Sequence, residues 1–237
     1  GATVSTPAET TSRGLLSFVH VPRTAGSSIE GLAFGEGLTR EQRKFWGRFA
    51  FCPPDDGAKR RRRCPEPHGD GCPPWHDPEI LRALYDENED VTTFCVVRSP
   101  SERLLSIFRY NDGRGRSECD AASFDRWVLR TMRDLRSRND AAPCRFLPQA
   151  SFPCERRLLF EDLESEFDAL MKEFGLNVTL GDGSAIRKAS TSCGNLEASD
   201  LSPEAQALVL SQYASDYSMR GMLLDERVTR ISLDDDD

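Results

Sequence analysis

The chain has 237 residues, of which 38% are hydrophobic, which is enough for one substantial domain that buries roughly 70–75% of its unfolded surface. Its formal net charge of −8 argues against a general nucleic-acid-binding protein, although a basic run lies at 59–63 and an acidic run at 234–237. No run of about 18 apolar residues occurs, so no segment is predicted to span a membrane.

We divide the chain into a disordered leader or expression scar at 1–13, one domain at 14–231 and an acidic tail at 232–237. The basic run at 59–63 is either a solvated loop or a patch that captures an acidic acceptor.

The domain opens with an apolar segment at 15–21, followed by a turn of sequence PRTAGSS. The dense apolar residues predict a strand buried on both faces, which Pro22 ends. The turn supplies one cation, three hydroxyls and a glycine before a helix-like segment at 29–34, so backbone N–H groups and a helix dipole are expected to face an anion. The absence of a Walker loop, GxxxxGK[ST], disfavours a magnesium-dependent nucleotide triphosphatase. Taken alone, an ordinary turn rich in small residues explains the pattern equally well.

A second apolar segment, at 92–97, ends in Arg98 and is followed by Ser99 and Pro100, which are typical of a helix start. Ser106 lies eight residues after Arg98, two turns into that helix. Both side chains are expected to converge on one small anion, Arg98 as a forked donor and Ser106 as a short one. Two such junctions suit a ligand with two separated phosphates.

Helices and strands alternate through the chain. Besides the segments above, we expect a helix and a broken amphipathic stretch at 29–51, an irregular loop at 52–78, a short helix at 78–85, a polar loop at 109–119, a helix at 122–138, a strand at 157–160, a helix at 163–174 that stops at Gly175, and a last helix from 203 to about 213. This alternation predicts an α/β fold, a single domain with a central parallel sheet flanked by helices.

The eight cysteines suggest an oxidising compartment, but their number leaves the pairing open. Cys144 and Cys154 flank a compact proline loop, so we predict a disulfide between them. Cys95 lies inside the second apolar strand, where a small buried thiol is expected. No CxxC pair occurs, which argues against a zinc site, and no other metal site is predicted. One N-glycosylation sequon, at 177–179, is consistent with a secretory route.

The sequences HVPRTAGSS (20–28) and VVRSPSERLLSIFR (96–109) resemble the two nucleotide motifs of the sulfotransferases that use 3'-phosphoadenosine 5'-phosphosulfate, PAPS. The resemblance implies a P-loop-like sulfotransferase fold, in which the first loop holds the 5'-phosphosulfate and the second motif holds the 3'-phosphate. Most members carry Lys where this chain has Arg23, although Arg occurs in some tyrosylprotein sulfotransferases, and Arg also delivers a cation. The cofactor-binding residues that the resemblance implies are Arg23, Thr24, Ala25, Gly26, Ser27, Ser28, Arg98 and Ser106.

Two later segments, CRFLPQASFPC (144–154) and LLFEDLESEFDALMKEFGL (158–176), resemble the region after the second motif in membrane-bound carbohydrate sulfotransferases. Those enzymes usually act in the Golgi and carry an N-terminal anchor. The resemblance therefore implies the lumenal domain of a type II membrane protein, cut from its anchor.

Sulfuryl transfer to a hydroxyl needs a base for the acceptor proton and a cation on the transferred group. Many carbohydrate sulfotransferases place a His base between the two phosphate motifs, where this chain has His76, so His76 and Arg23 are the predicted catalytic residues. Glu30 competes as the base, although a surface position on the first helix also explains it. His20, beside the loop, is interpreted as structural.

Three further residues have a role proposed from their position alone. Gln149 either contacts an acceptor or packs in a turn. Arg187 and Lys188 could close over the nucleotide.

We therefore expect a PAPS-dependent sulfotransferase that acts on a glycan hydroxyl, with no metal, no nucleic-acid partner, and a membrane contact only through an anchor outside this chain. Two alternatives stay open: a tyrosylprotein sulfotransferase, and a non-catalytic module of the same fold that binds an anionic glycan.

Overall fold

The computed structural model describes residues 14–52, 72–88, 90–112, 119–138, 142–181 and 193–223. Several predictions lie outside these residues: the leader at 1–13, the basic run at 59–63, Arg187 and Lys188, and the acidic tail at 232–237.

The centre of the fold is a sheet of three parallel strands in the order β1-β2-β3. The strands are β1 (Leu15–Phe18), β2 (Val91–Val97) and β3 (Arg156–Leu159). Leu16 pairs with Thr92, and Val96 pairs with Leu158. The predicted α/β class with a parallel sheet is therefore confirmed, with β2 as the central strand.

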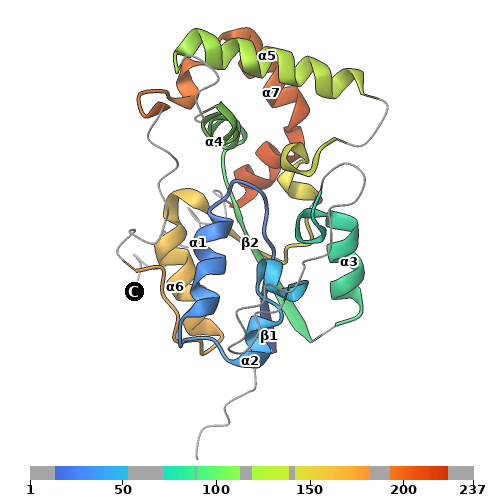
Figure 1. Ribbon diagram of the computed structural model, residues 1–237, viewed down its shortest axis with the longest axis vertical. Coiled ribbons are helices and arrows are strands. Elements are labelled where there is room, and N and C mark those ends of the chain that lie inside the picture. Colours follow the sequence, from blue (N-terminus) through green and yellow to red (C-terminus); the bar gives the residue numbers. More distant parts are fainter. Residues whose placement is uncertain are drawn as a thin grey trace, which may run out of the picture.

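Helices cover both faces of this sheet. The helices of the chain are α1 (Gly26–Gly31), α2 (Arg40–Arg43), α3 (Pro78–Asp86), α4 (Pro100–Asp112), α5 (Ala121–Ser137), α6 (Leu163–Glu173) and α7 (Pro203–Gln212). Phe94 and Val96 of β2 belong to the core cluster that contains residues of α1 and α6, whereas Cys95 and Val97 belong to the cluster that contains residues of α3. Figure 1 shows α1 and α6 on one side of β2 and α3 on the other. Because both faces of β2 are buried, its side chains show no alternation of apolar and polar residues.

A second group of helices lies beyond the carboxyl end of β2, where α4 begins (Figure 1). The helices α4, α5 and α7 pack around Phe108, Phe124, Val128 and Val209. Residues 214–223 are also helical. We call this group the helical lobe; it meets the sheet at the edge where β1 and β2 end.

The remaining regular segments are short 3-10 helices. They are η1 (Leu32–Phe34), η2 (Gly47–Ala50), η3 (Pro74–His76), η4 (Cys144–Phe146), η5 (Gln149–Ser151), η6 (Phe160–Asp162) and η8 (Ala198–Asp200).

The prediction that a polar loop begins at residue 109 is wrong, because α4 continues to Asp112. The guanidinium of Arg109 donates hydrogen bonds to the carbonyls of Cys193 and Leu196. These tertiary contacts hold a polar segment in the helix. The first helix also begins three residues earlier than predicted, at Gly26.

Three disulfides join the described residues, and they correct two predictions. Cys154 bonds to Cys95, and Cys144 bonds to Cys72, so the predicted bond between Cys144 and Cys154 is wrong. The predicted free thiol at Cys95 is also wrong: the residue faces away from α1 and α6, where Cys154 approaches it at the start of β3 with a Cα–Cα distance of 5.8 Å.

The third disulfide joins Cys119, just before α5, to Cys193. The three bonds fit a secretory or extracellular protein. Among the described residues, no helix is both long and apolar enough to cross a bilayer.

Candidate anion-binding site

The two predicted motifs lie side by side at one edge of the sheet. The first follows β1 and the second follows β2, and adjacent parallel strands end at the same edge. Beyond β1, the N–H of Val19 still donates to the carbonyl of Phe94 at 2.8 Å, so the two chains stay paired up to the loops.

The first loop has a constrained backbone. Arg23 and Ala25 have φ angles of 70° and 69°, in the left-handed region that non-glycine residues rarely occupy. Thr24 is fully buried, and its hydroxyl donates to the carbonyl of Val21 at 2.9 Å. This hydrogen bond stabilises the turn of the loop. Loops of this kind present successive N–H groups to one concave side. In α1 the N–H of Ser28 already donates to the carbonyl of Ala25 at 2.9 Å, so the N–H groups of Gly26 and Ser27 are the ones that precede the hydrogen bonds of the first turn.

Gly26 allows the loop to pack directly on His20. A Cβ atom at Gly26 would lie 2.0 Å from His20 Nε2. On the other side of the ring, His20 Nδ1 lies 2.8 Å from Glu30 Oε1, which also accepts the N–H of Arg48 at 2.8 Å. His20 is therefore held between Glu30 and the loop, as its structural interpretation implies.

Glu30 is not the surface residue that the sequence suggested, because only 3% of it is exposed. Burial by itself would raise the pKa of Glu30, but the hydrogen bonds from His20 and from the backbone of Arg48 hold that pKa below its ordinary value. Glu30 is thus a buried carboxylate with fixed partners.

Arg23 connects the two motifs. Its Nε donates to the hydroxyl of Ser106 at 3.2 Å, and its Nη2 donates to the hydroxyl and the carbonyl of Ser106 at 3.0 and 3.1 Å. The guanidinium also stacks over the ring of Tyr110 at 4.5 Å. Burial and the nearby charge of Arg98 lower the pKa of Arg23, while Tyr110 opposes them. Within the described part of the chain, no carboxylate forms an ion pair with Arg23.

Arg98 has different partners from those predicted. Its Nη2 donates to Glu102 at 3.0 Å, and its guanidinium lies 4.2 Å from the ring centre of Phe160. Burial lowers the pKa of Arg98, and the ion pair with Glu102 opposes that shift. Arg98 Nε is buried and has no hydrogen-bond partner among the described residues. Ser106, expected to face Arg98, instead bonds to Arg23.

Of the other loop residues, Ser27 is exposed at the site edge, whereas Ser28 is buried and Ala25 packs against the core beside α1. Thr24 and Ala25 can therefore offer a ligand their backbone N–H groups rather than their side chains.

The helix η3 places His76 beside the first loop. Its ring meets the ring of His20 edge-on, with 4.6 Å between centres, and the ring of Trp75 lies 6.0 Å from it. His76 Nε2 is buried and has no hydrogen-bond partner in the described ranges. Burial and the nearby His20 lower the pKa of His76 to about 2, so the ring is neutral at physiological pH.

Two buried residues, Gln149 and Asp216, support the backbone of Arg98. Gln149 is 1% exposed and hydrogen-bonds the backbone of Arg98, so it packs inside the protein and does not face an acceptor. Asp216, which is fully buried beside Gln149, was not predicted. Its sequence context, a polar stretch near the end of the described chain, carries no signal of such a role.

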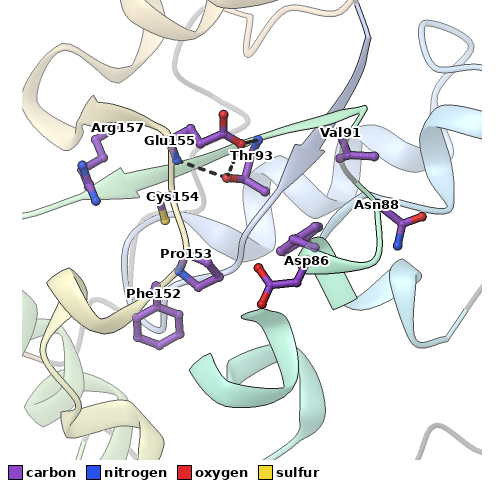
Figure 2. A pocket seen from close by; sticks show the side chains of 10 residues that line it. Asp86, Asn88, Val91, Thr93, Phe152, Pro153, Cys154, Glu155 and Arg157 are labelled. Atoms are coloured by element: carbon purple, nitrogen blue, oxygen red, sulfur yellow. Dashed lines mark hydrogen bonds between the residues drawn. The ribbon is translucent and has the colours of Figure 1, made fainter. Parts of the chain in front are cut away.

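A separate hollow of about 370 Å³ lies at the opposite edge of the sheet (Figure 2). It is lined by residues near the start of β2 and β3, including Val91, Thr93 and Arg157. Thr93 and Glu155 bind each other through the dashed contacts of Figure 2, at 3.0 to 3.3 Å. Since the loops lie beyond the other ends of the strands, this hollow is not part of the anion-binding site.

Comparison of the chain with protein-family models, with curated proteins and with solved structures finds no match.

Proposed function

We propose that this chain is a PAPS-dependent sulfotransferase that transfers a sulfuryl group to a hydroxyl of a glycan. The observation that carries the proposal is the contact of Arg23 with Ser106, because it joins the two motifs whose sequences resemble those of that family. The proposal includes the sulfotransferase type of α/β fold and a place in the Golgi lumen, which the three disulfides support only as far as the secretory route.

The donor groups suit a ligand with two phosphates. Arg23, Ser27 and the N–H groups at the start of α1 would hold the 5'-phosphosulfate. Arg98, with its buried unpartnered Nε, and Ser106 would hold the 3'-phosphate. When bound, PAPS supplies the sulfuryl group and a bisphosphate that leaves. The positive charge of Arg23 would then stabilise the negative charge that develops on the leaving phosphate during the transfer.

His76 is the better candidate for the base. Its Nε2 is unpartnered and its ring is neutral, so it can accept a proton from an acceptor hydroxyl. Glu30 already accepts hydrogen bonds from His20 and from the backbone of Arg48, and Arg48 Nε lies 3.6 Å from its second oxygen. Glu30 therefore serves to hold His20 in place.

One observation favours the non-catalytic alternative. A histidine with a pKa of about 2 is a weak base, and a binding module needs no base at all. An assay of labelled PAPS with a panel of glycans and tyrosine peptides separates the three readings. Transfer of the label to a glycan supports the proposal, and transfer only to a peptide supports a tyrosylprotein sulfotransferase. Binding of a glycan with no transfer of the label supports the non-catalytic module.

The first prediction concerns nucleotide binding. Arg98→Ala is expected to weaken the binding of adenosine 3',5'-bisphosphate by about 1.5–3 kcal/mol, because it removes a charge-assisted contact. Isothermal calorimetry at fixed salt measures the change. Arg133→Ala is the matched control, since Arg133 is an exposed arginine on α5 that pairs with Glu204. Equal affinity of the wild type and a folded Arg98→Ala protein would contradict the assignment.

A further inference from the structure

The backbone of Arg98 is fixed by a group of buried polar side chains. At the end of the sheet, Val97 pairs with Leu159, and β3 then turns into η6, so Arg98 has no strand partner there. The side chain of Gln149 takes that place: its Oε1 accepts the N–H of Arg98 at 2.9 Å, and its Nε2 donates to the carbonyl of Arg98 at 2.8 Å.

Asp216 holds Gln149 in this position. The same Nε2 donates to Asp216 Oδ2 at 3.2 Å, and Asp216 Oδ1 accepts the N–H of Ala150 at 3.0 Å. Arg103 supplies the neutralising charge, with its Nη1 3.9 Å from Asp216 Oδ2 and its Nη2 donating to the carbonyl of Leu147 at 2.7 Å. Arg103, Gln149 and Asp216 are each at most 1% exposed.

From these contacts we infer that Gln149 and Asp216 are positioning residues for Arg98. The inference rests on the proposed function, in which Arg98 binds the 3'-phosphate. Gln149, Asp216 and Arg103, which we call the Arg98 clamp, come from η5, from the helical segment 214–223 and from α4.

The chemistry of the clamp requires an amide at position 149. Only a side chain with one donor and one acceptor can bond both the N–H and the carbonyl of Arg98. A glutamate there would bring a carboxylate against the carbonyl of Arg98 and against Asp216. A methionine would keep the length and lose every hydrogen bond.

The clamp acts on the backbone from which the Arg98 side chain starts. The Arg98 side chain is 15% exposed, and its guanidinium lies over the ring of Phe160. A fixed backbone leaves fewer side-chain positions to be ordered when an anion binds. The expected role is therefore in the affinity for the 3'-phosphate, with no effect on the first loop.

The test compares two nucleotides by calorimetry, with Gln149→Met as the variant. We expect this protein to bind adenosine 3',5'-bisphosphate about tenfold more weakly than the wild type, and adenosine 5'-phosphate unchanged. In an Arg98→Ala background, Gln149→Met should cause no further loss. Equal weakening of both nucleotides, or an undiminished loss in that background, would overturn the inference.

A second set of variants keeps the test decisive if Gln149→Met folds poorly. Gln149→Glu should weaken bisphosphate binding, and adding Asp216→Asn should restore part of it, because the amide of residue 216 then donates to the new carboxylate. No recovery in the double variant would count against the clamp.

Hydrogen exchange of the Arg98 amide separates this inference from the proposed function. Protection of that amide should fall in Gln149→Met while the amide of Val128 in α5 stays protected. If the wild type binds neither nucleotide, the proposed function fails, and unchanged protection of Arg98 in the variant would overturn the clamp itself.

Discussion

The two arginines of the site carry the same charge in different surroundings. Arg23 bonds to a hydroxyl and a carbonyl of Ser106, which are neutral groups. Arg98 bonds to the carboxylate of Glu102, so an arriving phosphate must compete with that carboxylate. The competition is modest, because 38% of the Glu102 side chain is exposed and water screens the pair.

Removing the competing carboxylate is expected to tighten nucleotide binding. Glu102→Gln should bind adenosine 3',5'-bisphosphate about two- to fivefold more tightly, which corresponds to an exposed ion pair of under about 1 kcal/mol. Calorimetry at low and at high salt measures the effect, which should shrink as salt rises. Glu41→Gln, on α2, removes one negative charge elsewhere and should leave the affinity unchanged. Weaker binding by Glu102→Gln would show that Glu102 supports the site instead.

At the scale of elements, the shape of the first loop depends on the absence of a side chain at Gly26. Gly26 is closed off by the ring of His20, which Glu30 holds from the other side. A side chain at position 26 must displace that ring or the loop. The hydrogen bond of His20 with Glu30 would then be lost or lengthened.

Gly26→Ala is expected to destabilise the fold by about 1–3 kcal/mol, the usual cost of forcing extra volume into a packed site, and to weaken bisphosphate binding. Gly31→Ala is the matched control on the same helix, because no atom lies within 4 Å of its added Cβ. That variant should be neutral or more stable by roughly 0.5–1 kcal/mol. Chemical denaturation measures the free energy of unfolding of both variants. Equal stabilities of the two would contradict the packing argument.

The elements also indicate what could be predicted from the sequence. Local signals were sufficient for α3, α5, α6 and α7, where caps and apolar spacing determine the helix. Buried polar partners were not predictable, since Glu30 and Asp216 have the local sequence of ordinary surface residues. The predicted cysteine pairing was wrong for the same reason. Cys95 and Cys154 are 59 residues apart in the sequence and meet only because the strands pair.

For the whole molecule, the site lies where the sheet layer meets the helical lobe. The loop after β1 belongs to the sheet layer, whereas Ser106 and Tyr110 belong to α4 of the lobe. The disulfide between Cys72 and Cys144 ties the segment that carries His76 to the segment before Gln149. The site therefore depends on the packing of both parts, and its burial affects the stability of the whole chain.

Because His76 is buried at this junction, we expect it to make the stability of the fold sensitive to acid. The folded protein holds the pKa of His76 at about 2, whereas the unfolded chain has the ordinary value of about 6.5. Between these values the unfolded state binds one more proton, so the free energy of unfolding falls as the pH drops below about 6.5, by up to about 1.4 kcal/mol per pH unit. Above that pH this contribution is fully present.

Denaturant unfolding of the wild type and of His76→Gln from pH 8 to pH 4 measures this contribution. Subtracting the two curves removes the groups that titrate alike in both proteins. The wild type should lose stability relative to the variant as the pH falls, because a glutamine takes up no proton in the unfolded chain. A difference that stays constant over this range would mean that His76 titrates normally in the folded protein. In that case the ring is open to water, and His76 would be a base of ordinary strength.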